Sequence, residues 1–192
     1  SDPPAVERAA GGRVEAANIN HNPTEAQKAS GNYAKDRISW NGLKISIENA
    51  KGSQRSGIGK DGKEWRAVLP HHYGYVLGTE AKDGDHVDVC VGAHPKSPRV
   101  YVIDQINHET GAYDEAKCMI CFANEKQAVR SYKAAFSDGK GGDRIGKVTE
   151  ASIPEFKEWL ADGNTKKPFV LPRKSRSERV ADIVSRYGVQ AA

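Results

Sequence analysis

Leu43-Lys44-Ile45-Ser46-Ile47-Glu48 alternates strictly between apolar and polar residues, which is the pattern of a β-strand with one buried face. Five further strand-like runs follow it, separated by short polar turns, at residues 65–69, 73–77, 87–91, 100–106 and 118–122. Six short strands joined by polar turns predict a barrel or a strongly curled sheet.

Helical patterns appear only after these strands. Apolar residues recur at helical spacing on one face of residues 124–136, behind a cap pattern. A second helix is expected over 152–162, where Ser152 and Glu155 form a capping box, and a third over 177–187. Strands first and helices afterwards predict an α+β fold, a small curled or closed β-barrel of OB-like form with helices packed on it.

The chain divides into three segments of different composition. Residues 1–40 are rich in Ala, Asn, Gly and Pro and poor in large apolar side chains, so we expect a flexible N-terminal arm with a short helix around 24–30. Residues 41–165 carry the main strand and helix patterns, and 166–192 form a basic linker with a short helix. Because the only methionine is Met119, we expect the chain to be a processed product or an excised piece of a longer protein.

The formal net charge of +4 is unevenly distributed. Residues 166–179 hold six basic residues and one acid, which leaves 23 basic and 24 acidic residues in the rest of the chain. Aromatic residues do not alternate with the basic ones, and this favours a solvated linker over nucleic-acid binding. We therefore expect no nucleic-acid partner.

Cysteine content and hydropathy indicate the compartment. Three cysteines, an odd number, argue against a disulfide framework and for a reducing, cytoplasmic compartment. No stretch approaches the roughly 20 consecutive apolar residues of a bilayer-crossing helix, so we expect no membrane partner.

The strongest chemical signal is Asp83-Gly84-Asp85-His86-Val87-Asp88, just before the apolar run Val89-Cys90-Val91. Three carboxylates this close together repel one another unless cations neutralise them. Oxygen-only ligands suit Mg²⁺ or Mn²⁺ better than Zn²⁺. Taken alone, a motif of this kind is more often an ordinary acidic turn capped by Gly84 than a metal site.

Several other residues stand around this motif in an informative order. They are Glu48, Arg55, Arg66 and Pro70-His71-His72-Tyr73-Gly74-Tyr75 before it, and Asp114-Glu115-Ala116-Lys117 and Tyr132-Lys133 after it. Over roughly 43–133 this order resembles that of the soluble family I inorganic pyrophosphatases. From about 23 to 169 the chain also resembles the pyrophosphatase-like domain of multidomain (polyvalent) proteins of phages and other mobile elements.

The resemblance implies a role for each matching residue. Asp85 would be the general base, with Tyr73 and Lys117 as the other catalytic residues. The expected phosphate-binding residues are Arg55, Arg66, Tyr132 and Lys133. The expected metal ligands are Asp83, Asp88, the acid beside Lys117 (Glu115 by spacing, or the adjacent Asp114), Glu48 and Glu109. The resemblance further implies Mg²⁺ as cofactor, with Mn²⁺ as an alternative, pyrophosphate or another phosphoanhydride as substrate, and leaves a homo-oligomer open.

Departures from the family pattern affect the expected activity. Gly57 stands in place of a glutamate and Leu69 in place of a phosphate-contacting tyrosine, so two contacts are missing. Arg55 replaces a lysine, which keeps the charge and changes its geometry. We therefore expect Mg²⁺-dependent hydrolysis of inorganic pyrophosphate or a related phosphoanhydride. The alternative is a catalytically weakened module that binds nucleotides or phosphate ligands within a larger phage or mobile-element protein.

Three other motifs have simpler interpretations. Residues 141–148 resemble a P-loop, but Val148 replaces its Ser/Thr and a helix precedes it, so we expect a surface turn leading into a strand. Cys118 and Cys121 lie in an apolar run and are expected to be buried thiols. The neighbouring His71 and His72 should point to opposite faces of their strand.

Overall fold

The computed structural model describes residues 24, 26–27, 35–59, 62–172 and 184. Within these residues the elements are β1 (Asp36–Trp40), β2 (Leu43–Asn49), β3 (Gln54–Ile58), β4 (Glu64–Val68), β5 (His72–Val76), β6 (Asp88–Val91), β7 (Arg99–Ile106), β8 (Tyr113–Ile120), α3 (Glu125–Ala134), a 3-10 helix η1 (Gly141–Arg144), β9 (Ile145–Ser152) and α4 (Ile153–Asp162). The fold is mostly sheet with two α-helices, which confirms the α+β class.

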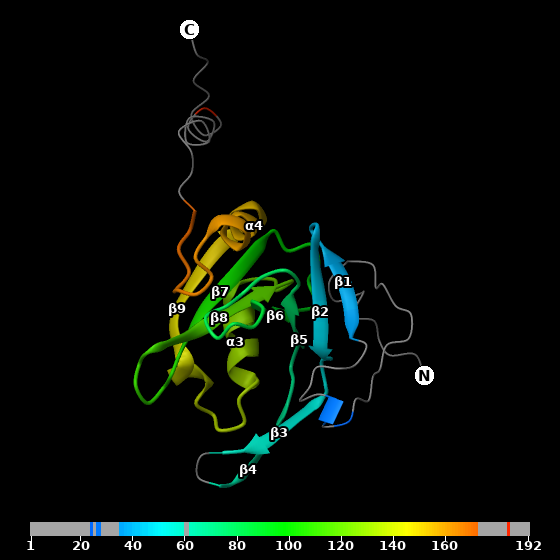
Figure 1. Cartoon of the computed structure of the whole chain (residues 1–192), viewed down its shortest axis with the longest axis vertical. Helices are drawn as coiled ribbons and strands as arrows, with labels where there is room; N and C mark the ends of the chain where they lie inside the picture. The colour runs from blue at the N-terminus through cyan, green and yellow to red at the C-terminus, as the bar shows by residue number, and fades with distance from the viewer. Residues whose placement is uncertain (1–23, 25, 28–34, 60–61, 173–183, 185–192) are drawn as a thin grey trace.

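Seven of the strands form one sheet in the order β1-β2-β5-β6-β8-β7-β9, while β3 and β4 form a separate hairpin. All neighbours in the large sheet are antiparallel except β6 and β8, which run parallel. In Figure 1 the β3–β4 hairpin projects below the large sheet. Strands β1 and β9 lie at the opposite edges of the large sheet. Since the two edge strands are not paired, the sheet is open and the closed barrel is not confirmed.

Each of the six predicted strands overlaps an observed one, namely β2, β4, β5, β6, β7 or β8. The sheet also contains β1, whose residues 36–40 fall within the segment expected to be an arm. Strand β3 has the sequence Gln-Arg-Ser-Gly-Ile and is largely exposed, so it lacks the apolar alternation that would have predicted it. Strand β9 follows the turn at η1, as expected for residues 141–148.

One face of the sheet is covered by α4 and is apolar. Phe156 and Trp159 of α4 are buried there, with Phe156 packed against Trp40 of β1 at 6.3 Å between ring centroids. Trp159 also packs against Phe169, whose backbone N–H donates to Asp104 Oδ1 at 2.8 Å. The buried core therefore extends past residue 165, where the predicted domain ends.

The capping residues identified in the sequence define the ends of both helices. Asn124 Oδ1 accepts the backbone N–H of Gln127 at the start of α3. Ser152 and Glu155 form the predicted capping box of α4, and Gly163 follows its last residue. These bonds satisfy backbone N–H groups that the first turn of a helix leaves without partners.

The opposite face of the sheet packs against α3 and holds both apolar and polar side chains. Because side chains alternate along a strand, Ala116 and Cys118 of β8 join the apolar cluster under α4, whereas Met119 packs with Ala128 and Tyr132 of α3. The same alternation places Lys117 and Glu115 on the α3 side. We call these two surfaces the α4 face and the α3 face.

The ends of the chain are described only in part. Thr24 and Gln27 make the reciprocal hydrogen bonds of a capping box, consistent with a helix starting there. The predicted helix over 177–187 and most of the basic segment lie outside the described residues. Among the helices of the described part of the chain, none has the length and apolarity needed to cross a membrane.

Candidate active site

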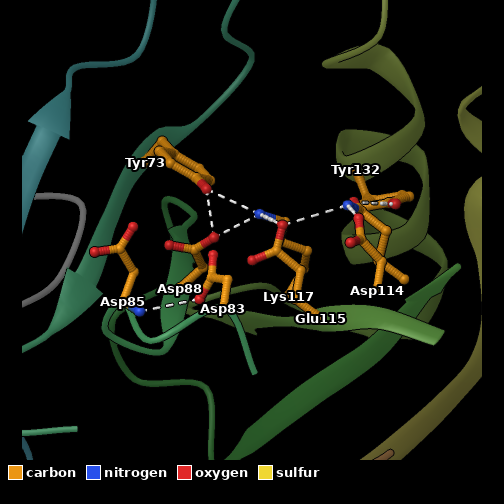
Figure 2. Close-up of polar contacts among 9 residues, drawn as sticks. Tyr73, Asp83, Asp85, Asp88, Asp114, Glu115, Lys117 and Tyr132 are labelled. Atoms are coloured by element: carbon orange, nitrogen blue, oxygen red, sulfur yellow. Dashed lines mark hydrogen bonds and ion pairs between the residues drawn. The ribbon is translucent and has the colours of Figure 1, made fainter. Parts of the chain in front are cut away.

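Lys117 is the centre of a polar cluster on the α3 face (Figure 2). Its ammonium lies 2.5 Å from Asp88 Oδ2 and 2.7 Å from Glu115 Oε1, and it donates to the Tyr73 hydroxyl at 2.9 Å. Tyr73 in turn donates to Asp88 Oδ2 at 2.5 Å. Strand register explains the convergence, since Asp88 pairs with Lys117 across the parallel β6–β8 ladder.

Burial shifts the pKa values of the charged groups in this cluster. Lys117 is only 9% exposed. Burial alone would lower the pKa of Lys117, but Tyr73, Asp88 and Glu115 outweigh it and hold that pKa well above its ordinary value. Burial raises the pKa of Glu115 to about 7 against the opposing pull of Lys117, and the nearby Asp88 carboxylate raises it further. The cluster thus contains two carboxylates for one ammonium and would gain from additional positive charge.

A cavity of about 810 Å³ opens beside the cluster. Of the predicted site residues, the cavity lining includes Arg55, Tyr73, Glu109, Glu115, Lys117 and Tyr132. The guanidinium of Arg55 lies over the Tyr73 ring, 5.2 Å from its centroid. Cationic groups from β3 and β8 therefore face the same space, an arrangement that suits a phosphate-bearing ligand.

Glu115 and Asp114, the two candidates for the acid beside Lys117, have different surroundings. Glu115 contacts the Lys117 ammonium directly, whereas Asp114 accepts a hydrogen bond from Gln105 Nε2 at 2.9 Å. Gln105 also accepts the Tyr132 hydroxyl at 2.7 Å, so this buried amide links α3 to β8. The geometry therefore favours Glu115 as the acid of the cluster.

Asp83 and Asp85 lie in the exposed turn that leads into β6. In Figure 2 Asp85 lies on the far side of Asp88 from Lys117, and Asp83 is drawn beside Asp88. Asp83 Oδ1 accepts the backbone N–H of Asp85 at 3.0 Å, and Gly84 between them has φ 91°. This positive φ favours glycine. Neither carboxylate lines the cavity, so the acidic turn borders the cluster from outside it.

The carboxylates of this region match a hard divalent cation by chemistry, since all their donor atoms are oxygen. No three acidic, histidine or cysteine side chains of the described residues are arranged as a preformed metal site. Between Asp88 and Glu115 the Lys117 ammonium supplies the positive charge instead. The donor set therefore fits Mg²⁺, and the surplus carboxylate charge around Lys117 is consistent with such an ion.

Five other predicted site residues are absent from the cavity lining: Asp88 and Asp114, described above, and Arg66, Lys133 and Glu48. Arg66 pairs with Glu64 at 3.1 Å, and its side chain is 63% exposed. Lys133 lies over Gly142 of η1. Glu48 forms an ion pair with Lys35 at 3.0 Å.

The two histidines at the start of β5 and the cysteines of the α4 face are buried. His71 Nδ1 lies 2.8 Å from Ser131 Oγ, while His72 Nδ1 accepts the backbone N–H of Lys51, so the two rings have separate partners. Burial, with a smaller contribution from His72, lowers the pKa of His71 to about 4. Burial raises the pKa of Cys121 to about 12 and that of Cys118 well above its usual value, and both thiols are free.

Sequence reasoning did not single out Gln105 or Arg144 as site residues, although both line the cavity. Gln105 could have been noticed as a polar residue inside the apolar β7 run Val-Tyr-Val-Ile-Asp-Gln-Ile. Arg144 pairs with Asp138 at 2.8 Å and lies over the Phe136 ring. No local pattern distinguishes it from an ordinary surface arginine.

A cavity with converging cations and carboxylates on a mainly antiparallel sheet is the kind of site that handles phosphate groups. The family model described as Inorganic Pyrophosphatase matches residues 25–161, which is well over half of the chain. The chain therefore belongs to the inorganic pyrophosphatase family. Neither a curated protein nor a solved structure matches it at a significant level.

Proposed function

We propose that this domain hydrolyses inorganic pyrophosphate, or a related phosphoanhydride, with Mg²⁺. The observation that carries the proposal is the Lys117 cluster, in which one buried ammonium holds Asp88, Glu115 and Tyr73 beside the cavity. Membership of the inorganic pyrophosphatase family supports the same reaction.

The residues that face the cavity would bind the polyanionic substrate. Arg55 and Lys117 supply positive charge to its phosphate oxygens, and the Tyr73 hydroxyl orients both Lys117 and Asp88. Phosphoryl transfer needs mainly positioning and charge neutralisation from a protein. These groups therefore bind the leaving phosphate and limit the repulsion between substrate and attacking water.

The acidic residues would have two tasks. Asp83, Asp88 and Glu115 would hold Mg²⁺, which supplies further charge neutralisation and water activation when bound. Asp85 would accept the proton of the attacking water from the exposed turn beside Asp88. Glu109, which lines the cavity on the loop between β7 and β8, would be a further ligand.

A second candidate function is a binding module with weakened catalysis, part of a larger phage or mobile-element protein. It is favoured by Gly57 and Leu69, which replace polar residues of the family pattern, and by the ion pair that holds Glu48 away from the cavity. Such a module would bind nucleotides or phosphate ligands without turning them over. A cytoplasmic location agrees with three free, buried thiols.

Phosphate release from inorganic pyrophosphate in Mg²⁺ distinguishes the two candidates. The intact chain should release phosphate, and Asp85→Asn and Asp88→Asn should each lose activity by several orders of magnitude. Asp162→Asn is the matched control, because this exposed carboxylate ends α4 on the other face. An inactive intact chain that still binds a divalent ion or a nucleotide would favour the binding module.

A further inference from the structure

Part of the cavity wall is apolar. Trp65, Ala67 and Leu69 line it from β4 and the residue just after that strand, and Phe136 lines it from beyond the end of α3. Trp65 is 39% exposed, so a large part of its surface is open to a ligand. Inorganic pyrophosphate has no apolar group that could pack against these side chains.

Gly57 is what allows Trp65 to lie along this wall. The two residues are partners across the β3–β4 hairpin. A Cβ atom at position 57 would lie 2.8 Å from the Trp65 ring, closer than side chains pack. Position 57 is where the resemblance places a glutamate, and 69 is where it places a tyrosine. The two departures therefore create an apolar wall in addition to removing polar contacts.

The size of the cavity indicates a ligand larger than pyrophosphate. At about 810 Å³ it falls in the upper part of the range of about 300–1,000 Å³ found for sites that enclose drug-sized molecules. Its lining joins the Arg55 and Lys117 cations to the Trp65 ring in one space. A ligand that uses both carries phosphate groups at one end and a flat apolar group at the other.

We propose that the site recognises nucleoside phosphoanhydrides, with the phosphates at Arg55 and Lys117 and the base against Trp65. This inference rests on the proposed function and specifies its substrate class. With ADP, the water oxygen bonds to the β-phosphorus and the bond from that phosphorus to the bridging oxygen breaks. AMP leaves with the bridging oxygen, inorganic phosphate forms, and Asp85 accepts the water proton before releasing it to solvent.

Calorimetric titration with two non-hydrolysable probes in Mg²⁺ tests the inference. The probes are α,β-methylene-ADP, which carries the base, and imidodiphosphate, which does not. The intact chain should bind the nucleotide analogue about fivefold to a hundredfold more tightly, because stacking on an aromatic side chain contributes about 1–3 kcal/mol per base. Trp65→Ala should remove that advantage and leave imidodiphosphate binding unchanged, whereas Trp65→Phe should keep most of it.

Two further variants complete the test. Val68→Ala changes an exposed residue of the same strand that does not line the cavity, so it should alter neither affinity. Gly57→Ala should displace the Trp65 ring and weaken the analogue selectively. Unchanged imidodiphosphate binding shows that each variant is folded. Equal binding of both probes by the intact chain, or an equal loss of both in Trp65→Ala, would overturn the inference.

The outcomes separate this inference from the proposed function. The intact chain could bind the nucleotide analogue through Trp65 and yet hydrolyse neither pyrophosphate nor ADP. That result would contradict the proposed hydrolysis and uphold nucleoside phosphoanhydrides as the ligand class. The opposite result is also possible. If pyrophosphate hydrolysis depends on Asp88 but Trp65→Ala hydrolyses ADP as fast as the intact chain does, hydrolysis is upheld and the nucleoside ligand class is refuted.

Discussion

The two faces of one sheet differ in what they bury. The α4 face is filled with apolar side chains such as Trp40, Phe156 and Trp159. The α3 face has a smaller apolar cluster beside a buried ammonium, two carboxylates and a phenol. Alternate residues of the same strands point to opposite faces. Lys117 therefore lies in the polar cluster on the α3 face, whereas the adjacent Cys118 lies in the apolar core on the α4 face. The apolar contacts of α4 stabilise the fold, while α3 and its strands hold the polar cluster and cavity of the candidate site.

Replacing Lys117 should have the largest effect, because it changes both stability and activity. In Lys117→Met the carboxylates of Asp88 and Glu115 lose their buried partner, and breaking such a pair costs about 3–5 kcal/mol of unfolding free energy. Loss of one charged donor to the substrate should also reduce phosphate release about a hundredfold to a thousandfold. Urea unfolding and a phosphate-release assay measure the two effects. Wild-type activity in this variant would mean that the α3 face does not hold the catalytic site.

Truncating Phe156 should affect stability alone. Phe156 is fully buried in α4 against Trp40 and Trp159. Phe156→Ala should lower the unfolding free energy by about 3–5 kcal/mol through the cavity it leaves. Below its melting temperature, the folded variant should keep the affinity of the intact chain for imidodiphosphate. A loss of imidodiphosphate affinity in the folded variant would show that the α4 face also contributes to ligand binding.

Acid should destabilise the protein through its buried histidines. The pKa of His71 falls from 6.5 to about 4 on folding, mainly by burial, and that of His72 is lowered as well. Between these two pH values the unfolded chain binds a proton at His71 that the folded chain does not. The contribution of His71 to the unfolding free energy should therefore decrease as the pH falls from about 6.5 towards 4. Glu115, whose pKa is raised to about 7, contributes in the opposite direction over the same window, so the His71 contribution is measured against a variant.

The matched variant His71→Gln should remove this contribution, so that its unfolding free energy falls less, or rises more, than that of the intact chain as the pH is lowered through the window, while the contributions of His72 and Glu115 remain. Urea unfolding at a series of pH values across the window compares the two chains. An identical pH dependence in both would show that His71 is not the group responsible.

Removing the α4 cap should have the smallest effect. Ser152→Ala deletes the hydroxyl that accepts the Glu155 N–H and should cost about 1 kcal/mol of stability. Asn124→Ala removes the equivalent cap of α3, which carries Tyr132, at a similar cost. Only the second variant should also weaken imidodiphosphate binding, and equal affinities in the two variants would argue against a role for α3 in positioning the site.

The sequence predicted those parts of the fold where one face of an element is apolar. The alternation in 43–48 and the capping box at Ser152 each mark an element that the structure contains. Strand β3 has no apolar face, and Phe169 joins the core through a contact with Asp104, 65 residues earlier in the chain. Neither feature leaves a local pattern, so β3 and the extension of the core past residue 165 could not be found from spacing alone.

The site was predictable in its composition and less so in its geometry. Tyr73, Asp88, Glu115 and Lys117 were identified together from their order, and strand register brings them into contact. Arg66 forms an exposed ion pair with Glu64 and is absent from the cavity lining, and its order in the sequence does not contain that information. The apolar wall also depends on the packing of Trp65 over Gly57, which requires the β3–β4 pairing to be known.

Amide chemical-shift mapping with imidodiphosphate and Mg²⁺ shows directly whether ligand binds to the α3 face. The large shifts should fall on residues around the cavity, including Tyr73, Lys117 and Tyr132. Phe156 and Trp159 under α4 should move little. Shifts centred on the α4 face, or a saturable interaction that leaves Lys117 and its neighbours unperturbed, would contradict binding to the α3 face.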